Sequence, residues 1–381
     1  MDFRISEEQE LLLESLRELV AREAPEEYIK QHDENHTYPS SFIQALTDNG
    51  FGMLGVPEEY GGTEVDILTL MLVAEEIAKQ GVPTYLYGNA LGIDDMLTFG
   101  NDEQKAITME YAKKGELSFS LGFTEPQAGS DSSSLQTSYT RKDGKVIING
   151  HKTFITGASQ SPYILCMARN ADTTDPNKTF SMWFVPANSP GITIEPLHKL
   201  GMNMVPTCEV YLDNVVVEEK DLVGEEGKGF IQLMKNFEIE RLMLSAGCLG
   251  AAQCAFADAA RYANQRVQFG KPIGSFQLIQ EKLTYMAIKI ENMKNMVYKT
   301  AWQKDNNISV KTSSALTKLY CAQSAFEIAD DAMQILGGIG YTTDHRVSRI
   351  WRDLRSQRIA GGTDQIMVHI AGRAILKEYS K

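Results

Sequence analysis

The sequence predicts an α+β protein in which a β block lies between two helical blocks. Apolar residues recur at helical spacing over residues 1–116, short β-branched and aromatic segments fill 117–226, and much longer helical patterns occupy 227–381. At 381 residues the chain is long enough for several domains with substantial cores. We therefore expect an N-terminal helical domain, a middle antiparallel β domain and a C-terminal four-helix bundle over these three ranges.

The first block opens with a helix-start signal. Ser6 followed three residues later by Gln9 is a capping box, and the leucines after it fall on one helix face. A second helical pattern runs through Phe42 and stops at Gly50. The segment 69–78 is apolar nearly all round, which indicates a helix buried on several sides.

The two later blocks differ sharply in pattern. Segments such as YILCMAR and CEVYLDNVVV are short and bounded by turn residues, which is typical of an antiparallel sheet, and Asp143-Gly144 is a good hairpin turn. After residue 226 the helical patterns 230–266, 275–306 and 310–336 are all too long for an average helix. They suit long antiparallel helices in a bundle, the last of which ends at Gly337-Gly338.

Composition excludes several classes of function. The net charge of −13 and pI near 5.1 argue against nucleic-acid binding, which needs a basic surface. Five scattered cysteines without a CxxC pair argue against a disulfide framework and a zinc ribbon. No run approaches the roughly 20 apolar residues of a membrane span, and the acid-rich N-terminus is no signal peptide. We expect a reduced, cytoplasmic protein without a membrane span.

Two local motifs are weak candidates for sites. His32 and His36 are four residues apart, but no third metal ligand is evident, so a solvated helix end is the preferred interpretation. The string GEEGKG at 224–229 suits a domain linker better than a phosphate cradle. No Rossmann, P-loop, zincin or hydrolase motif occurs.

Six unusual strings occur in one order along the chain. They are PEEYGG at 57–62, FTEPQAGSD at 123–131, KTFITGA at 152–158, RVQFGKPIGSFQLIQ at 266–280, QILGGIGY at 334–341 and RIAGGTDQI at 358–366. With the block order, they resemble the acyl-CoA dehydrogenase family over essentially the whole chain. Within it, RYANQR and the GGTD ending are similar to bacterial crotonobetainyl-CoA reductases and their enterobacterial acyl-CoA dehydrogenase paralogues.

The resemblance implies FAD as the cofactor. In the family the TEPQAGSD loop faces the flavin, and its amides and hydroxyls stabilise negative charge on the reduced ring. The family more often has Trp where this chain has Phe154. The residues that the resemblance assigns to FAD are Leu121, Phe123, Thr124, Ser130, Phe154, Thr156, Arg266, Gln268, Phe269, Gln277, Gln334, Gly337, Gly338, Thr363 and Gln365. Because Arg266, Gln268 and Phe269 would reach the FAD of a neighbouring subunit, a homotetramer is expected.

The catalytic base departs from the commonest family pattern. The reaction removes a proton from the α carbon of an acyl-CoA thioester, and many members supply the base as a Glu immediately before the Gly-Thr of the terminal loop. Here that position is Gly361, which cannot take a proton. A minority branch supplies the Glu from the long helix that opens the C-terminal domain, which matches Glu240. Glu240 is therefore the candidate base, although a surface acid on a charged helix is the plainer interpretation of EIER alone.

The resemblance also assigns substrate contacts and partners. Ser130, Glu238, Arg241, Gly361 and Gly362 match positions around the acyl-CoA thioester, and an arginine suits a phosphate or carbonyl oxygen. Electrons would pass to or from an electron-transfer flavoprotein. The same residues serve both directions of the reaction, so enoyl-CoA reduction stays open. Two other functions stay open, a non-dehydrogenase flavoprotein on this scaffold and a non-catalytic partner subunit. The chain length and charge of the acyl group stay open as well.

Overall fold

A computed structural model describes residues 4–87, 89–175 and 179–380 of the chain. The N-terminal block is helical, as predicted. Its helices are α1 (Glu7–Glu23), α2 (Glu26–Asn35), α3 (Ser40–Asp48), α4 (Ile67–Lys79), α5 (Asn89–Phe99) and α6 (Asp102–Ala112). Both hydrogen bonds of the Ser6–Gln9 capping box are present at the start of α1. Gly50 takes a left-handed conformation (φ 84°) after α3.

Helix α4 is the central helix of this block. Its residues from Thr69 to Ala78 are all buried, which confirms the interpretation of its apolar run. It packs against α1 on one side and against the long helix α7 on the other. One apolar cluster therefore joins the N-terminal helices to the C-terminal bundle.

The middle block is a sheet with the strand order β6-β7-β3-β2-β4-β5-β8, and β1 pairs with β4. Asp143 and Gly144 both have positive φ in the β2–β3 hairpin turn, as a type I′ turn requires. The strands are β1 (Phe119–Gly122), β2 (Ser138–Lys142), β3 (Lys145–Thr156), β4 (Tyr163–Asn170), β5 (Phe180–Pro186), β6 (Ile192–Pro196), β7 (Thr207–Val217) and β8 (Leu222–Val223).

The middle domain was predicted to be antiparallel, and in the structure two of the pairings in its sheet are parallel. Strands β1 and β2 both pair with β4 in parallel, whereas the other ladders are antiparallel. Side-chain alternation has the same period in both kinds of ladder, so the sequence pattern could not reveal the direction of pairing.

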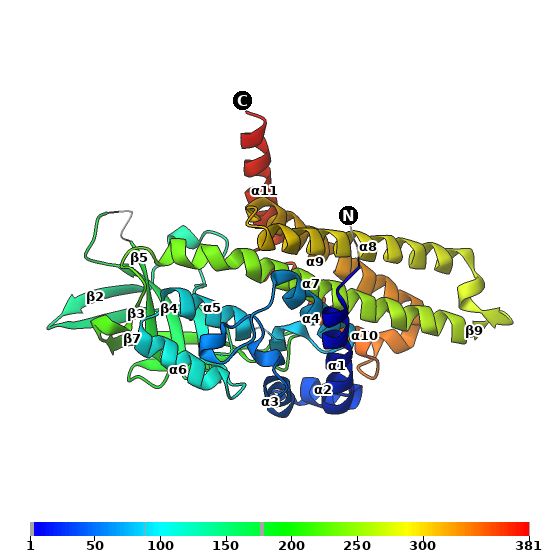
Figure 1. Cartoon of the computed structure of the whole chain (residues 1–381), viewed down its shortest axis with the longest axis horizontal. Helices are drawn as coiled ribbons and strands as arrows, with labels where there is room; N and C mark the ends of the chain where they lie inside the picture. Colours follow the sequence, from blue (N-terminus) through cyan, green and yellow to red (C-terminus); the bar gives the residue numbers. More distant parts are fainter. Residues whose placement is uncertain (1–3, 88, 176–178, 381) are drawn as a thin grey trace.

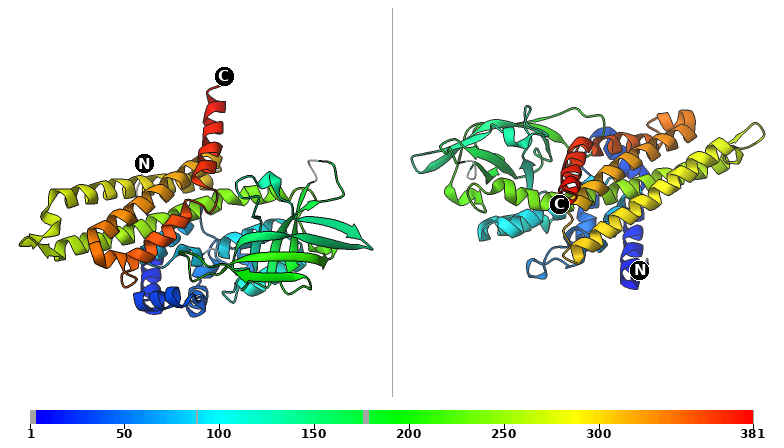
Figure 2. Two further views of the ribbon diagram at one scale, coloured as in Figure 1. Left: turned by 180° about the vertical axis from the view of Figure 1, so that it is seen from behind. Right: turned by 90° about the horizontal axis from the view of Figure 1, so that it is seen from above.

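The C-terminal block consists of helices α7 (Gly229–Gln265), α8 (Gln277–Asp305), α9 (Lys311–Leu336), α10 (Arg346–Gln357) and α11 (Asp364–Glu378), with a small hairpin β9 (Val267–Gln268) and β10 (Lys271–Pro272). Helices α7 to α10 pack together as the bundle. Only the beginning of α11 packs on α9, through Met367 and Ala371 against Ala315. The rest of α11 projects away from the bundle (Figure 1), as the two views of Figure 2 also show.

Helix α7 connects the three blocks and positions the site. Its first third lies against the sheet, where Leu233 and Phe237 share a cluster with Met96 of α5 and Leu121 of β1. Its later turns pack on α4, α8 and α9. By length and hydropathy alone α7 could cross a membrane, but 72% of that apolar window is buried inside the protein, as in the core helix of a globular domain.

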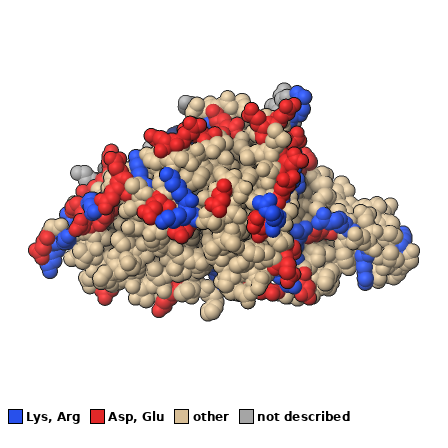
Figure 3. Space-filling model, turned by 60° about the horizontal axis from the view of Figure 1, so that its bottom comes forward, with Lys and Arg blue, Asp and Glu red and all other residues tan. Residues whose placement is uncertain are grey.

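The charged side chains of both signs are mixed on the molecular surface. On the face shown in Figure 3, basic side chains are interspersed with acidic ones, and the described residues there form no continuous basic surface. This distribution agrees with the net charge of −13. An anionic substrate must therefore be held by local groups and not by a broad positive field.

Candidate active site

The loop that contains TEPQAGSD begins at the end of β1 and is fixed from beneath by a buried ion pair. Lys152 Nζ of β3 lies 2.8 Å from Glu125 Oε1, and both side chains are almost fully buried. The same ammonium donates to the carbonyl of Phe123 at 3.1 Å. The backbone N–H of Thr153 donates to the carbonyl of Thr124 at 2.9 Å. The strings at 123–131 and 152–158 are therefore held side by side.

Glu125 is the centre of this arrangement. Burial alone would raise the pKa of its carboxyl, but the charge of Lys152 and the backbone N–H of Gln136 outweigh burial and hold that pKa at about 2. The N–H groups of Gln136 and Thr137 donate to its two oxygens at 2.6 and 2.9 Å. Sequence reasoning missed both Glu125 and Lys152 as functional residues, although each belongs to one of the six strings that carry the family resemblance.

Predicted flavin contacts also lie on β1, on the loop after it and on β3. Leu121 and Phe123 are partly buried, and the Phe123 ring meets Phe237 of α7 edge-on at 6.0 Å between centroids. Phe154 and Thr156 of β3 are both exposed on either side of the buried Ile155, next to an irregularity in the pairing of β3 with β7. Phe154 is 65% exposed and has a φ of 58°, which is uncommon for an aromatic residue. Ser130 is exposed at the end of the loop.

Glu240 lies one turn beyond Phe237 on α7 and is partly buried. Burial raises the pKa of its carboxyl above the ordinary 4.5, while the charges of Arg241 and Lys318 oppose that rise. Gly361 faces the same carboxylate: a Cβ added to it would lie 4.0 Å from Glu240 Oε1. The structure therefore brings together the two positions, 240 and 361, at which the resemblance places the base.

The terminal loop that carries Gly361 is tied to the bundle by a second buried lysine. Lys318 of α9 is 1% exposed, and its Nζ donates to the carbonyl of Gly362 at 2.6 Å. The side-chain oxygen of Thr363 accepts a hydrogen bond from the N–H of Ile366 and so caps α11. Gln365 is exposed in the first turn of that helix. Sequence reasoning gave no signal for Lys318, because a lysine within a long helix ordinarily points to solvent.

Arg241 fits the predicted contact with an anionic or carbonyl oxygen. Its side chain is 7% exposed, and its guanidinium lies 5.9 Å from the centroid of the Phe237 ring. No group in the part of the chain that the structure describes accepts a hydrogen bond from its buried Nε. A buried donor without a partner is costly, so a substrate oxygen suits this place. Glu238 is partly buried on the same helix.

The remaining predicted cofactor residues lie elsewhere on the same chain. Arg266, Gln268 and Phe269 are at the β9–β10 hairpin, at the opposite end of the molecule from the sheet (Figure 1), and Phe269 is 93% exposed. Gln277 begins α8, while Gln334, Gly337 and Gly338 end α9, and all four are exposed. One chain does not bring them to the TEPQAGSD loop, so their role as contacts from a neighbouring subunit stays a prediction.

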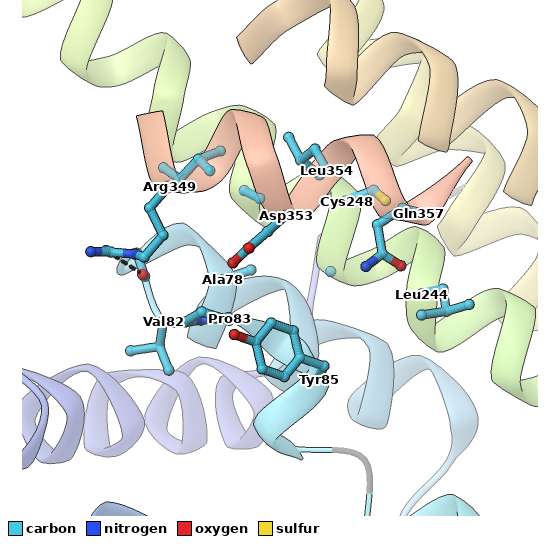
Figure 4. A pocket seen from close by; sticks show the side chains of 14 residues that line it. Ala78, Val82, Pro83, Tyr85, Leu244, Cys248, Arg349, Asp353, Leu354 and Gln357 are labelled. Atoms are coloured by element: carbon cyan, nitrogen blue, oxygen red, sulfur yellow. Dashed lines mark hydrogen bonds between the residues drawn. The ribbon is translucent and has the colours of Figure 1, made fainter. Parts of the chain in front are cut away.

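A small cavity with a mostly apolar lining borders this region (Figure 4). It has a volume of about 40 Å³ and lies between α7, α10 and the segment after α4. Leu244 lines the cavity and would also be 2.5 Å from a Cβ at Gly361. Tyr85 Oη and Gln357 Oε1 have no partner among the described residues, and burial raises the pKa of Asp353 to about 6. The cavity is large enough for a few waters, which its few polar groups can bind.

The two weak motifs have structural roles. His32 Nδ1 pairs with Thr37, and the residue after His32, Asp33, forms an ion pair with Arg352. No group of three or more metal-binding side chains occurs among the described residues. In the 224–229 string, Glu226 pairs with Arg141 at 2.7 Å, which anchors the linker to the sheet. All five cysteines are free and buried.

Family models for the N-terminal, middle and C-terminal domains of acyl-CoA dehydrogenases match residues 6–116, 120–215 and 227–376. The chain belongs to the acyl-CoA dehydrogenase family, a class of flavin-dependent oxidoreductases. It is 58% identical to the probable acyl-CoA dehydrogenase YdiO of Escherichia coli K12, over 100% of this chain and 99% of that protein.

Solved structures show the same fold. Butyryl-CoA dehydrogenase from Megasphaera elsdenii superposes with a TM-score of 0.91 at 31% identity, over 99% of this chain and 100% of that one. A chain from a structure described as the electron transferring flavoprotein of Acidaminococcus fermentans has a TM-score of 0.91 at 30% identity, over the same shares. The family and fold predictions are confirmed, including the order of helical, β and helical domains.

Proposed function

We propose that this protein is an FAD-dependent oxidoreductase acting on the α,β carbon–carbon bond of a short-chain or modified acyl-CoA thioester, with Glu240 as the base. The observation that carries the proposal is the position of Glu240 against Gly361. The carboxylate of Glu240 lies where a side chain at 361 would point, so it can replace the loop Glu that this chain lacks. It is also one turn from Phe237, which contacts the flavin loop.

The residues around the site fit FAD and a CoA thioester. Phe154, Thr156 and Ser130 offer an aromatic face and hydroxyl groups beside the fixed TEPQAGSD loop, and Arg241 offers a buried free donor. When bound there, FAD supplies the acceptor for the hydride of the β carbon. Glu240 takes the α proton, and its partly buried setting suits a base because the raised pKa approaches the working pH. The charges of Arg241 and Lys318 oppose that rise in the pKa of Glu240.

The first test is the pH profile of flavin reduction. Since Glu240 must be ionised to accept the proton, the rate should fall as the pH drops through a midpoint above 4.5. Lys318→Met should move that midpoint to higher pH, because the Lys318 charge opposes the rise in the pKa of Glu240. Lys311→Met, at the exposed start of α9, serves as the matched control and should leave the midpoint in place. A midpoint that Lys318→Met lowers would contradict this assignment.

The second test moves the base to the loop. Gly361→Glu in a Glu240→Gly background should restore part of the activity, because the two side chains share one space. Leu244→Ala is added to make room for the new side chain, since a Cβ at 361 would be 2.5 Å from Leu244 Cδ1, and the φ of 63° at Gly361 adds strain. We expect the triple variant to reduce its flavin at least about tenfold faster than Glu240→Gly, which is a small part of what a positioned base contributes. Equal rates would show that the positions are not interchangeable.

We propose that electrons pass between this enzyme and an electron-transfer flavoprotein. The Acidaminococcus fermentans structure, described as an electron transferring flavoprotein, contains a chain of this fold and so supports such a partner. A homotetramer is proposed as well. The exposed apolar residues Phe269, Leu278 and Tyr285 around the β9–β10 hairpin support an interface there.

A further inference from the structure

Strand β3 contains a β-bulge directly beside the TEPQAGSD loop. The pairs on either side of the bulge are Lys152 with Val210 and Ile155 with Cys208. Two residues of β3 therefore lie opposite one residue of β7, which is Glu209. This two-against-one count defines a β-bulge, and bulges next to active sites commonly redirect a side chain.

The bulge changes which side chains of β3 are buried. Lys152 and Ile155 are three residues apart, yet both are buried, because their partners on β7 are two residues apart and share one face. Of the two bulge residues, Thr153 is buried, whereas Phe154 is exposed and has the positive φ of 58°. An aromatic residue in this conformation is strained, and such strain persists only where the surrounding contacts enforce it.

The side chain of Glu209 makes the contacts that hold the bulge from the β7 side. Its Oε1 accepts a hydrogen bond from the hydroxyl of Thr153 at 2.6 Å, and its Oε2 is hydrogen-bonded to Nε2 of His151. The His151 ring in turn stacks on Tyr211, with 4.3 Å between centroids, which restrains its rotation. Because Thr153 is 2% exposed and the Glu209 side chain 18% exposed, little water competes for these hydrogen bonds.

Thr153 also joins the bulge to the flavin loop. Its backbone N–H donates to the carbonyl of Thr124 at 2.9 Å. On the opposite face of β3, Lys152 forms the buried ion pair with Glu125. The bulge is therefore held from both faces of the strand, and the contact of Glu209 reaches the flavin loop through a single residue, Thr153.

We propose that Glu209 is a positioning residue for the flavin, which holds Thr153 and so fixes the bulge that directs Phe154 toward FAD. The inference rests on the function proposed above, in which Phe154 and the TEPQAGSD loop lie against FAD. Without the carboxylate, the Thr153 hydroxyl loses its acceptor and the strained backbone of Phe154 loses its support. The bulge and the loop would then have to be ordered when FAD binds, which lowers the affinity.

The test measures the Kd of FAD from the flavin that the holoenzyme releases on dilution. Glu209→Ala and Thr153→Val should each raise this Kd about tenfold, the factor expected for a lost hydrogen bond to a charged group. The double variant should bind FAD about as weakly as Glu209→Ala alone, because both substitutions remove the same contact. Thr153→Val keeps the shape of the side chain, so it tests the contact even if Glu209→Ala does not fold.

Two further variants serve as controls for the Kd measurement. Glu209→Gln keeps an acceptor for the Thr153 hydroxyl, so its Kd should stay within about threefold of the wild-type value. Glu195→Ala makes the same substitution as Glu209→Ala at the exposed residue opposite Glu209 on β6, and it should leave the Kd unchanged. A rise in Kd for Glu195→Ala equal to that for Glu209→Ala would show that the bulge contact is not the cause and would overturn the inference.

Visible circular dichroism of the bound FAD separates positioning from a general effect on stability. At saturating FAD, Glu209→Ala should change the flavin bands in the same direction as Phe154→Ala. Adding Glu209→Ala to Phe154→Ala should change the bands no further, because Glu209 acts on the flavin through Phe154. If Glu209→Ala lowers only the stability of the holoenzyme in urea, with wild-type Kd and dichroism, the contact is structural and the inference is refuted.

The results also separate this inference from the proposed function. If Glu209→Ala and Thr153→Val keep the wild-type Kd, or if their effects multiply in the double variant, the role of Glu209 is refuted while acyl-CoA oxidation stands. If FAD binds but no acyl-CoA, including butyryl-CoA, bleaches it, the proposed function fails, and the Kd values still decide the role of Glu209. If the purified wild-type protein binds no FAD, both fail.

Discussion

Replacing Glu240 with Gln is expected to slow anaerobic reduction of the flavin by an active acyl-CoA about 10³- to 10⁴-fold, the upper part of what a positioned general base contributes. Glutamine has nearly the same shape but cannot accept the α proton. The partly buried site of Glu240 holds no hydrogen-bonded partner that the substitution would strand among the described residues. The measurement is stopped-flow flavin bleaching.

Glu238→Gln is the matched control for this experiment, since it removes the same charge two residues earlier on α7. We expect it to change the apparent affinity for the thioester more than the rate of bleaching at saturation. Bleaching of Glu240→Gln at the wild-type rate would end the assignment of the base. Loss of flavin from Glu240→Gln before substrate is added would instead reveal a structural role.

Lys152→Met is expected to give the largest loss of stability among single substitutions at the site. It leaves the Glu125 carboxylate buried without its cation, and breaking such a pair costs about 3–5 kcal/mol. Because Phe123 loses its hydrogen bond from the same ammonium, the flavin loop should loosen and FAD affinity should fall too. Urea unfolding of the apoprotein and flavin titration measure the two effects separately.

Lys145→Met, on the same strand, is the control for this prediction. Its pair with Glu218 is about half exposed on both sides, so the loss of stability should be small beside that of Lys152→Met. The double variant Glu125→Gln/Lys152→Met should recover part of the stability, because no buried charge is left unpaired. Equal losses for Lys152→Met and Lys145→Met would show that the buried pair does not hold the loop.

The Glu125–Lys152 pair also predicts how stability depends on pH. The pKa of Glu125 is lowered in the folded protein. The contribution of Glu125 to the stability of the fold is therefore fully present above the ordinary pKa of 4.5. That contribution is lost as the pH falls from 4.5 through about 2, where the folded-state carboxyl takes up its proton. Over the same pH range, the stability of Glu125→Gln should fall less than the stability of the wild type.

Much of the architecture could be read from the sequence because its signals are local. Ser6 with Gln9, Gly50 and the Asp143-Gly144 turn mark element ends through hydrogen bonds and backbone angles that neighbouring residues decide. The long helices of the bundle were predicted to within a few residues of their bounds, since their apolar spacing persists over many turns. The assignment of Glu240 as the base came from the family resemblance and from the absence of a Glu at 361.

The features that the sequence did not reveal depend on contacts between distant segments. Lys152 and Lys318 are charged residues inside a strand and a helix, where most lysines are exposed, and only the fold shows their buried partners. The projection of α11 likewise depends on tertiary packing that ends after its first turns.

The crowding at Gly361 has a consequence for how this family can change its base over evolution. A Glu gained at 361 while Glu240 is present would put its Cβ 4.0 Å from Glu240 Oε1 and 2.5 Å from Leu244 Cδ1, which sets two acids side by side in a crowded place. Losing Glu240 first leaves no base at all. A lineage that moves the base must therefore alter positions 240, 244 and 361 together or pass through a nearly inactive ancestor. Such epistasis would keep the two placements in separate branches and make intermediates between them rare.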